Sequence, residues 1–213
     1  MQDLVIATGI IITWYGIYKG WKNIESMFID ACKENDINAV YKFIHYFRVD
    51  PSINNQYAIR KACYKGYIEL VKLLLLDNRV DPSIYNNEPF ITACWSGNLE
   101  IVKILLKNSR VDPSDNKNSG FRQAVDTVNI DIVKLLLDDP RVDPTDCDNS
   151  AIRWALNHKQ AEMVKLLIND QRIQSSFLIS HSYCIWSKEM EEILIPYKYK
   201  PDMPEYNRLA KLK

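Results

Sequence analysis

The sequence predicts an all-α fold, a solenoid of stacked helix-turn-helix repeats with degenerate capping units at its ends and short loops between repeats. Two observations predict it. The motif RVDPS begins at Arg48, Arg79 and Arg110 and returns as RVDPT at Arg141, 31 residues apart each time. The residues between these motifs have the hydrophobic spacing of two short amphipathic helices. Self-similarity at a fixed period of this length is typical of proteins built from stacked repeats.

The first helix of each repeat is predicted by two aligned columns of residues. A small residue at one position would let two helices approach closely, and a large apolar residue stands three positions earlier, on the same helical face. The small column reads Ala62, Ala93, Ala124 and Ala155, and the large one reads Ile59, Phe90, Phe121 and Ile152.

The second helix is predicted by apolar residues at positions i, i+3, i+6 and i+7, which form a wide stripe. Its columns begin at Ile68, Leu99, Ile130 and Ala161 and include Val71, Val102, Val133 and Val164, then Leu74, Leu105, Leu136 and Leu167. An acidic residue three positions before a lysine recurs on the opposite face, as in Glu69 and Lys72. Such pairs favour a solvated face and contribute a few tenths of a kcal/mol each.

Turns are predicted at both ends of each helix pair. Gly66 and Gly97 mark the turn between the two helices, where the later repeats carry Val128 and Lys159. The Asp-Pro pair of each motif ends the second helix, because proline disfavours a helical residue before it. A column rich in asparagine is expected to cap the next first helix; it comprises Asn55, Asn86, Asn87, Asn118 and Asn149.

One unit of 31 residues buries too little apolar surface to offset its chain entropy, so neighbouring units must share a core. The predicted organisation is an apolar segment at 1–21, an amino-terminal capping repeat at 22–47, repeats at 48–78, 79–109, 110–140 and 141–171, a degenerate capping repeat at 172–197 and an extended tail at 198–213.

Composition excludes several classes of function. Lysine plus arginine equal aspartate plus glutamate at 27 each, so no net charge draws the chain to nucleic acid. The six glycines form no phosphate-binding motif, and no cofactor is predicted. Five cysteines without CxxC or zinc-type spacing predict no metal site and fit a reducing compartment. Three of them, Cys32, Cys63 and Cys94, stand in the repeat register and are expected to be buried.

No catalytic constellation is predicted. His181 and Cys184 form the one reactive-looking cluster, and His45 and His158 stand apart from it. A nucleophile needs a base within hydrogen-bond reach and a group that orients the base, and the local sequence supplies neither an orienting group nor oxyanion donors. The sequence therefore favours a protein that is not an enzyme.

Residues 4–18 contain no charged side chain and allow three interpretations. They form an apolar helix that packs on the first repeat, a marginal membrane anchor with the repeats in the cytosol, or a cleaved signal. A helix of this length reaches about 22 Å, short of the hydrocarbon core of about 30 Å. The negative charge before the run is not the pattern of a secretory signal. The tail at 198–213 has scattered charges and two prolines.

The repeat resembles the ankyrin family. The residues that carry the resemblance are Ala62, Gly66 and the segment Glu69–Leu74, together with EPFITA at Glu88–Ala93, a worn form of the family's Thr-Pro-Leu-His-x-Ala motif in which Pro89 and Ala93 match. The pattern most resembles the variant common in giant DNA viruses of amoebae. The family's repeats are usually 33 residues long, so the loops between these repeats are predicted to be shorter than the family's hairpin fingers.

The resemblance implies a monomeric, non-catalytic module that binds a protein partner, a host protein in the host cytosol if the viral likeness holds. Binding is then expected on the concave surface of the first helices, where residues differ between repeats while core columns do not. These residues are Lys61, Tyr64, Lys65, Thr92, Trp95, Gln123, Asp126, Trp154, Asn157 and His158. The aromatic members are of the types that anchor interfaces; they could also pack on the neighbouring repeat. The alternative function is a membrane-tethered scaffold that uses residues 4–18.

Overall fold

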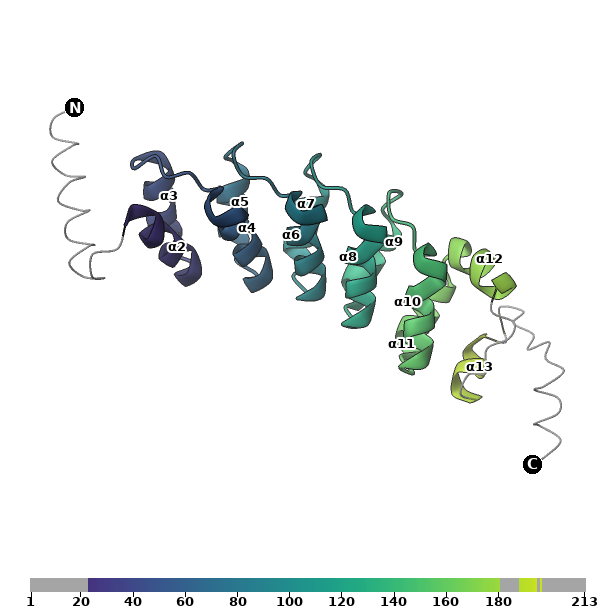
Figure 1. Ribbon diagram of the computed structural model, residues 1–213. Coiled ribbons are helices and arrows are strands. Elements are labelled where there is room, and N and C mark those ends of the chain that lie inside the picture. Colours follow the sequence, from purple (N-terminus) through teal and green to yellow (C-terminus); the bar gives the residue numbers. More distant parts are fainter. Residues whose placement is uncertain (1–22, 181–187, 195, 197–213) are drawn as a thin grey trace, which may run out of the picture. The chain divides into compact units, whose positions relative to one another are not determined.

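The structure is a computed structural model that describes residues 23–180, 188–194 and 196 (Figure 1). The secondary structure of the described residues is helical, without strands, so the predicted all-α repeat fold is confirmed. The chain groups into two compact units. Unit 1 takes in residues up to 62 and residues 67–81, and unit 2 takes in residues 63–66 and those from 82 onward.

Unit 1 contains α2 (Ile24–Glu34), α3 (Ile37–His45), most of α4 (Ile53–Lys65) and α5 (Ile68–Leu75). Asn23 caps α2 by accepting from the Ser26 amide at 2.7 Å, and Asp36 caps α3 by accepting from the Ala39 amide at 2.9 Å. The rings of Phe28 and Phe43 meet edge to face, with centroids 6.3 Å apart. These contacts hold α2 and α3 together as a hairpin.

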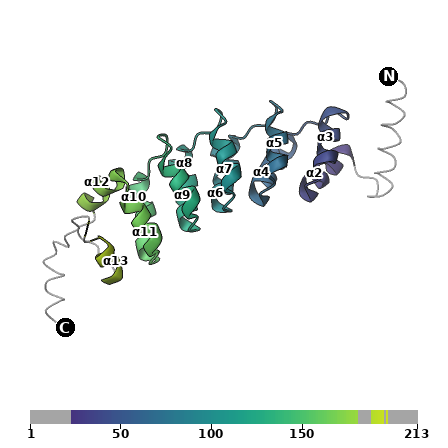
Figure 2. The same ribbon diagram turned by 180° about the vertical axis from the view of Figure 1, so that it is seen from behind.

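Unit 2 stacks three helix hairpins (Figures 1 and 2). They are α6 (Ile84–Trp95) with α7 (Leu99–Leu106), α8 (Asp115–Asp126) with α9 (Ile130–Leu137), and α10 (Asp146–Asn157) with α11 (Ala161–Ile168). The first helices α6, α8 and α10 pack in sequence, and α12 (Gln171–Ser180) and α13 (Lys188–Leu194) pack against the last hairpin. The predicted solenoid arrangement is thus present in this unit.

The core is formed by the aligned columns that the sequence singles out. The small and large columns of the first helices and the valine and leucine columns of the second helices are all buried. Cys32, Cys63 and Cys94 are buried and free, as expected. Burial raises the pKa of the Cys32 thiol to about 12 and also raises the pKa values of the other two. These thiols therefore stay protonated at neutral pH and are poor nucleophiles.

Each RVDPS motif leads into a left-handed turn that the sequence did not predict. Three consecutive residues have positive φ at residues 54–56, 85–87, 116–118 and 147–149, and most of them are Asn or Asp. A backbone bond closes the turn, as where the Asn118 amide donates to the Ser114 carbonyl at 2.9 Å. Asparagine tolerates this conformation better than other residues with a side chain. The asparagines therefore allow the backbone to adopt the left-handed turn.

The prediction that the asparagine column caps the first helices is wrong. No side-chain cap bond starts α6, α8 or α10. Instead, the third residue of the turn points inward and binds the next repeat. Asn118 is 3% exposed; its Oδ1 accepts from the Asp143 amide at 2.9 Å and its Nδ2 donates to Asp146 Oδ2 at 2.9 Å. Asn87 makes the same pair of bonds to Asp112 and Asp115.

The motif arginines form a second link between repeats. Arg141 donates to the carboxylate of Asp139, to the carbonyl of Leu106 at the end of α7 and to the carbonyl of Val111 in the loop after α7. Arg172 makes the corresponding four bonds one repeat later. These bonds give Arg141 and Arg172 a structural role between hairpins. The same ion pairs lower the pKa values of the carboxyls of Asp139 and Asp170.

The ion pairs predict a dependence of stability on pH. Because these carboxyls have lowered pKa values in the folded chain, their contribution is present above the unfolded pKa of about 3.9 and is lost as pH falls through the folded value. We expect Arg141→Gln with Arg172→Gln to reduce the free energy of unfolding at pH 6, with the difference from the wild type shrinking below about pH 4. Urea unfolding between pH 6 and pH 2.5 measures it. A difference that stays constant to pH 2.5 contradicts the assignment.

The turn between the two helices of a repeat needs a left-handed residue. Gly66 and Gly97 have φ +76°, and a Cβ on Gly97 would lie 2.9 Å from Asn129 Oδ1. That asparagine donates to the carbonyl of Cys94 at 3.1 Å. Val128 occupies the equivalent position with φ 58°. A β-branched residue is strained there.

We expect Val128→Gly to raise the free energy of unfolding by about 1 kcal/mol, because glycine relieves the left-handed strain and the valine side chain it removes lies outside the core, 37% exposed. Gly97→Val, the reverse change one repeat earlier, should destabilise the chain. Urea unfolding of both variants measures the two shifts. A loss of stability in Val128→Gly contradicts the strain argument.

Candidate protein-binding surface

The varying residues of the first helices fall into three columns that differ in exposure. Tyr64, Trp95, Asp126 and Asn157 form one column, and all four are exposed. Lys61, Thr92, Gln123 and Trp154 form another, and all four are half-buried. The third column holds Lys65, Ser96, Thr127 and His158, of which Lys65 and His158 are exposed. The position of a residue around its helix thus determines whether a partner can reach it. The column that contains Trp95 is the most exposed of the three.

Tyr64 and Trp95 form an aromatic pair across two successive repeats in unit 2. Their rings are stacked, with centroids 5.9 Å apart and planes 12° apart. Trp95 nevertheless remains 47% exposed and Tyr64 42% exposed. Lys65 adds its ammonium 5.4 Å from the centre of the Tyr64 ring. The two interpretations of the aromatic residues are therefore compatible here, because each ring packs on its neighbour with one side and faces solvent with the other.

Trp154 lies differently. Its ring stacks on His158 of the same helix turn, with centroids 4.0 Å apart, and its side chain is half-buried. The Trp154 carbonyl is 2.9 Å from His158 Nδ1. A carbonyl oxygen only accepts, so Nδ1 carries the proton in this geometry. Trp154 and His158 thus form a closed local pair, and Trp95 is the better anchor for a partner.

Two hydroxyls of the third column are used inside the fold. Ser96 Oγ donates to the Thr92 carbonyl at 2.7 Å, and Thr127 Oγ1 donates to the Gln123 carbonyl at 2.8 Å. Each hydroxyl also accepts from the asparagine that begins the second helix. These bonds fix the ends of α6 and α8, which hold Trp95 and Asp126.

Asp126 brings an acidic group to the surface. Partial burial raises the pKa of its carboxyl, and the charges of Arg122 and His158 oppose the rise. The surface therefore has an aromatic part around Trp95 and a polar part around Asp126. Such a mixture of an aromatic anchor and a polar surround is typical of protein interfaces.

The remaining predicted residues are accounted for as follows. Lys61 belongs to unit 1, whereas the other predicted binding residues belong to unit 2. No group of metal-ligating side chains gathers within the described ranges. His181, Cys184, residues 4–18 and the tail at 198–213 lie outside the described residues. None of the helices that the structure describes is both long and apolar enough to cross a membrane.

Sequence reasoning missed a pocket in unit 1, lined among others by Tyr41, His45, Arg48 and Leu76. The available signal was Leu76 itself. It stands in a column that otherwise reads Lys107, Asp138 and Asn169, so a leucine there departs from the pattern of a solvated position.

The comparisons with known proteins agree with the repeat pattern. No curated protein sequence matches the chain. A family model described as "Ankyrin repeats (3 copies)" matches residues 28–118, which span α2 to the start of α8. Ankyrin repeats are generally protein–protein interaction modules and are typically not catalytic. Residues 28–118 thus match the pattern of three ankyrin repeats, within an all-α chain whose described helices continue the same pairing.

Proposed function

We propose that the chain is a non-catalytic module that binds a partner protein through the exposed column of the first helices in unit 2. The observation that carries the proposal is the stacked pair of Tyr64 and Trp95. A large aromatic side chain that is held rigid yet half exposed loses little conformational entropy when a partner covers it. This is the property of an interface anchor.

The neighbouring positions support the same surface. Asp126 follows Trp95 in the exposed column, and Thr92 and Gln123 flank the column as half-buried polar residues. They differ from repeat to repeat, whereas the buried columns keep small or aliphatic residues. Positions that are free to differ without disturbing the core are those that determine which partner binds.

Affinity purification with mass spectrometry, using the full chain as bait, tests the proposal. We expect Trp95→Ala and Tyr64→Ala each to lower the affinity for the recovered partner by about tenfold or more, since anchor residues contribute about 2 kcal/mol or more. Lys134→Ala is the matched control, because it removes an exposed side chain from a second helix of the same unit. Circular dichroism verifies that all variants fold.

Partners retained equally by Trp95→Ala and the wild type contradict the proposal. Partners lost in Lys134→Ala but kept in Trp95→Ala place binding on the second helices, which also contradicts it. The double variant Trp95→Ala with Trp154→Ala should bind more weakly than Trp95→Ala. The additional loss of affinity should be smaller than the loss that Trp95→Ala itself causes, since the Trp154 ring is already covered by His158.

The proposed location is the cytoplasm, that of the host cell if the chain is viral, and the proposed state is a monomer. The free buried cysteines Cys32, Cys63 and Cys94 support a reducing compartment. Fractionation of the full-length chain against a chain that lacks residues 1–20 tests this against the membrane-tethered alternative. Recovery of the full-length chain with membranes, and of the shortened chain without them, would replace the cytoplasmic proposal by the tethered one.

A further inference from the structure

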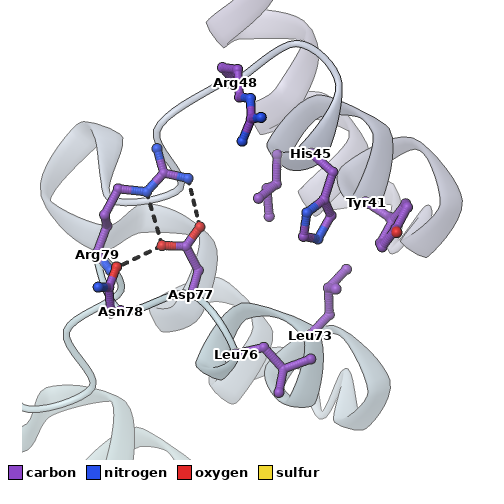
Figure 3. Close-up of a pocket in the computed structure, with 9 residues that line it drawn as sticks. Tyr41, His45, Arg48, Leu73, Leu76, Asp77, Asn78 and Arg79 are labelled. Atoms are coloured by element: carbon purple, nitrogen blue, oxygen red, sulfur yellow. Dashed lines mark hydrogen bonds and ion pairs between the residues drawn. The ribbon is translucent and has the colours of Figure 1, made fainter.

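A pocket of about 670 Å³ lies in unit 1, and none of the residues proposed above to bind a partner lines it (Figure 3). Tyr41 and His45 reach it from α3, and Arg48 reaches it from the loop that follows α3. Leu73, Leu76 and Arg79 line it from α5 and the turn after α5. It therefore lies between the second helices of two successive repeats.

The pocket exists because Arg79 does not bind as its equivalents do. Arg141 extends to the carbonyls of Leu106 and Val111, at and after the end of α7, and Arg172 extends to those of Leu137 and Val142, at and after the end of α9. Each arginine thus lies beside the end of the second helix one hairpin earlier. The Arg79 guanidinium donates to the carboxylate of Asp77, at 2.6 Å and 2.9 Å. Within the described ranges it makes no bond to the carbonyls of Ile44 and Val49, which are equivalent to Leu106 and Val111. The corresponding space in unit 1 is left open.

One part of the pocket is apolar and unusually exposed. Leu76 is 84% exposed and Tyr41 is 45% exposed. In the three later repeats the position of Leu76 holds a charged or amide side chain. Tyr41 is fixed by the ring of His45, whose centroid is 4.3 Å away. An exposed leucine beside a fixed aromatic ring gains apolar contact when a partner covers it, about 25 cal/mol per Å².

The other part of the pocket is basic. The lining holds two guanidinium groups, those of Arg48 and Arg79, and one carboxylate, that of Asp77, with which Arg79 already pairs. Asp50, outside the lining, acts on Arg79 as well. Arg48 makes no hydrogen bond or ion pair with the part of the chain that the structure describes. A guanidinium group prefers a carboxylate, which it binds with two parallel hydrogen bonds. The lining thus offers a free cation beside an apolar surface.

We propose that this pocket binds a segment of a partner protein in which a leucine-like side chain adjoins an aspartate or glutamate. The apolar side chain covers Leu76 and Leu73, and the carboxylate pairs with Arg48. A peptide fits better than a fatty acid, because small ligands bury most of their surface when bound and Leu76 lies on an open surface rather than in an enclosed channel. The proposal is independent of the surface around Trp95.

Fluorescence anisotropy with the full chain tests it. The probe is a short fluorescein-labelled peptide that contains two leucines flanked by glutamates, and the comparison peptides replace either the glutamates by lysine or the leucines by serine. We expect the leucine–glutamate peptide to bind, and both comparison peptides to bind at least about tenfold more weakly. Arg48→Glu and Leu76→Glu should each weaken binding of the first peptide at least about tenfold.

Lys107→Glu is the matched control, because it places a glutamate at the position equivalent to Leu76 in the next repeat and changes the net charge by as much as Arg48→Glu; it should leave binding unchanged. Equal binding of the lysine peptide or the serine peptide overturns the proposal, as does no binding up to about 1 mM. Tighter binding of dodecanoate that depends on Arg48 assigns the pocket to a lipid instead. A dimer seen by sedimentation and lost in Leu76→Glu assigns it to a second copy; both outcomes overturn the peptide proposal.

Discussion

Leu105→Ala is expected to lower the free energy of unfolding by about 3 kcal/mol, because it leaves a cavity in the apolar layer that joins the hairpins. Leu105 is fully buried at the end of α7, in the leucine column that recurs in every repeat. α7 packs both on α6 of its own hairpin and on α9 of the next, so the loss weakens the fold of one repeat and its contact with its neighbour.

Leu76→Ala is the matched control for this measurement. It removes the same atoms from a leucine that is 84% exposed, and it should change the free energy of unfolding by less than about 0.5 kcal/mol. Urea unfolding followed by far-ultraviolet circular dichroism measures both variants. Similar losses in the two variants contradict the claim that the recurring leucines hold the stack.

Asn118→Ala is expected to lower the free energy of unfolding by about 3 kcal/mol, although asparagine is polar and stands in the left-handed turn at the start of α8. The change removes the acceptor for the Asp143 amide and the donor to the Asp146 carboxylate. Both groups are then left without the partner that the fold provides, and a hydrogen bond to a charged group contributes about 1.5–3 kcal/mol. Alanine is also less suited than asparagine to φ 52°.

Lys117→Ala separates these effects. Lys117 precedes Asn118 in the same left-handed turn, with φ 57°, but its side chain is exposed. Its replacement should leave the free energy of unfolding within about 0.5 kcal/mol of the wild type. If Asn118→Ala is as mild as Lys117→Ala in urea unfolding, the buried amide does not join the repeats as the hydrogen bonds indicate.

The helices and the core could be predicted from the sequence because apolar side chains at fixed spacing leave few ways to bury them. Ala124, Val133 and Leu136 lie in the core for that reason. The left-handed turn after each RVDPS motif could not be predicted, since asparagine is common both as a helix cap and in the left-handed conformation. The two alternatives differ in where the amide points, and only the packing of the next repeat selects the inward orientation seen at Asn118.

The candidate surface was predicted in part. None of the varying positions singled out in the first helices is buried, but the spacing alone did not separate exposed Trp95 from half-buried Trp154. The stacking of Trp154 on His158 depends on side-chain conformations that the sequence does not specify. The pocket beside Arg48 was missed because it depends on which groups Arg79 binds. Among the described residues, the Arg79 guanidinium donates to Asp77 alone, whereas Arg141 also donates to the Leu106 carbonyl, although both stand in the same motif.

Site-specific photo-crosslinking most directly tests whether the varying positions of the first helices meet a partner. Benzoylphenylalanine placed at Gln123 or Asp126 leaves the pair of Tyr64 and Trp95 unchanged. Asp126 follows Trp95 in the exposed column, and Gln123 lies in the half-buried column that flanks it. Benzoylphenylalanine at Lys134 or Lys165, on the second helices, is the control. We predict covalent capture of a partner protein from the first two positions and none from the control positions. Capture from Lys134 or Lys165 alone, or equally from all four positions, would contradict this account.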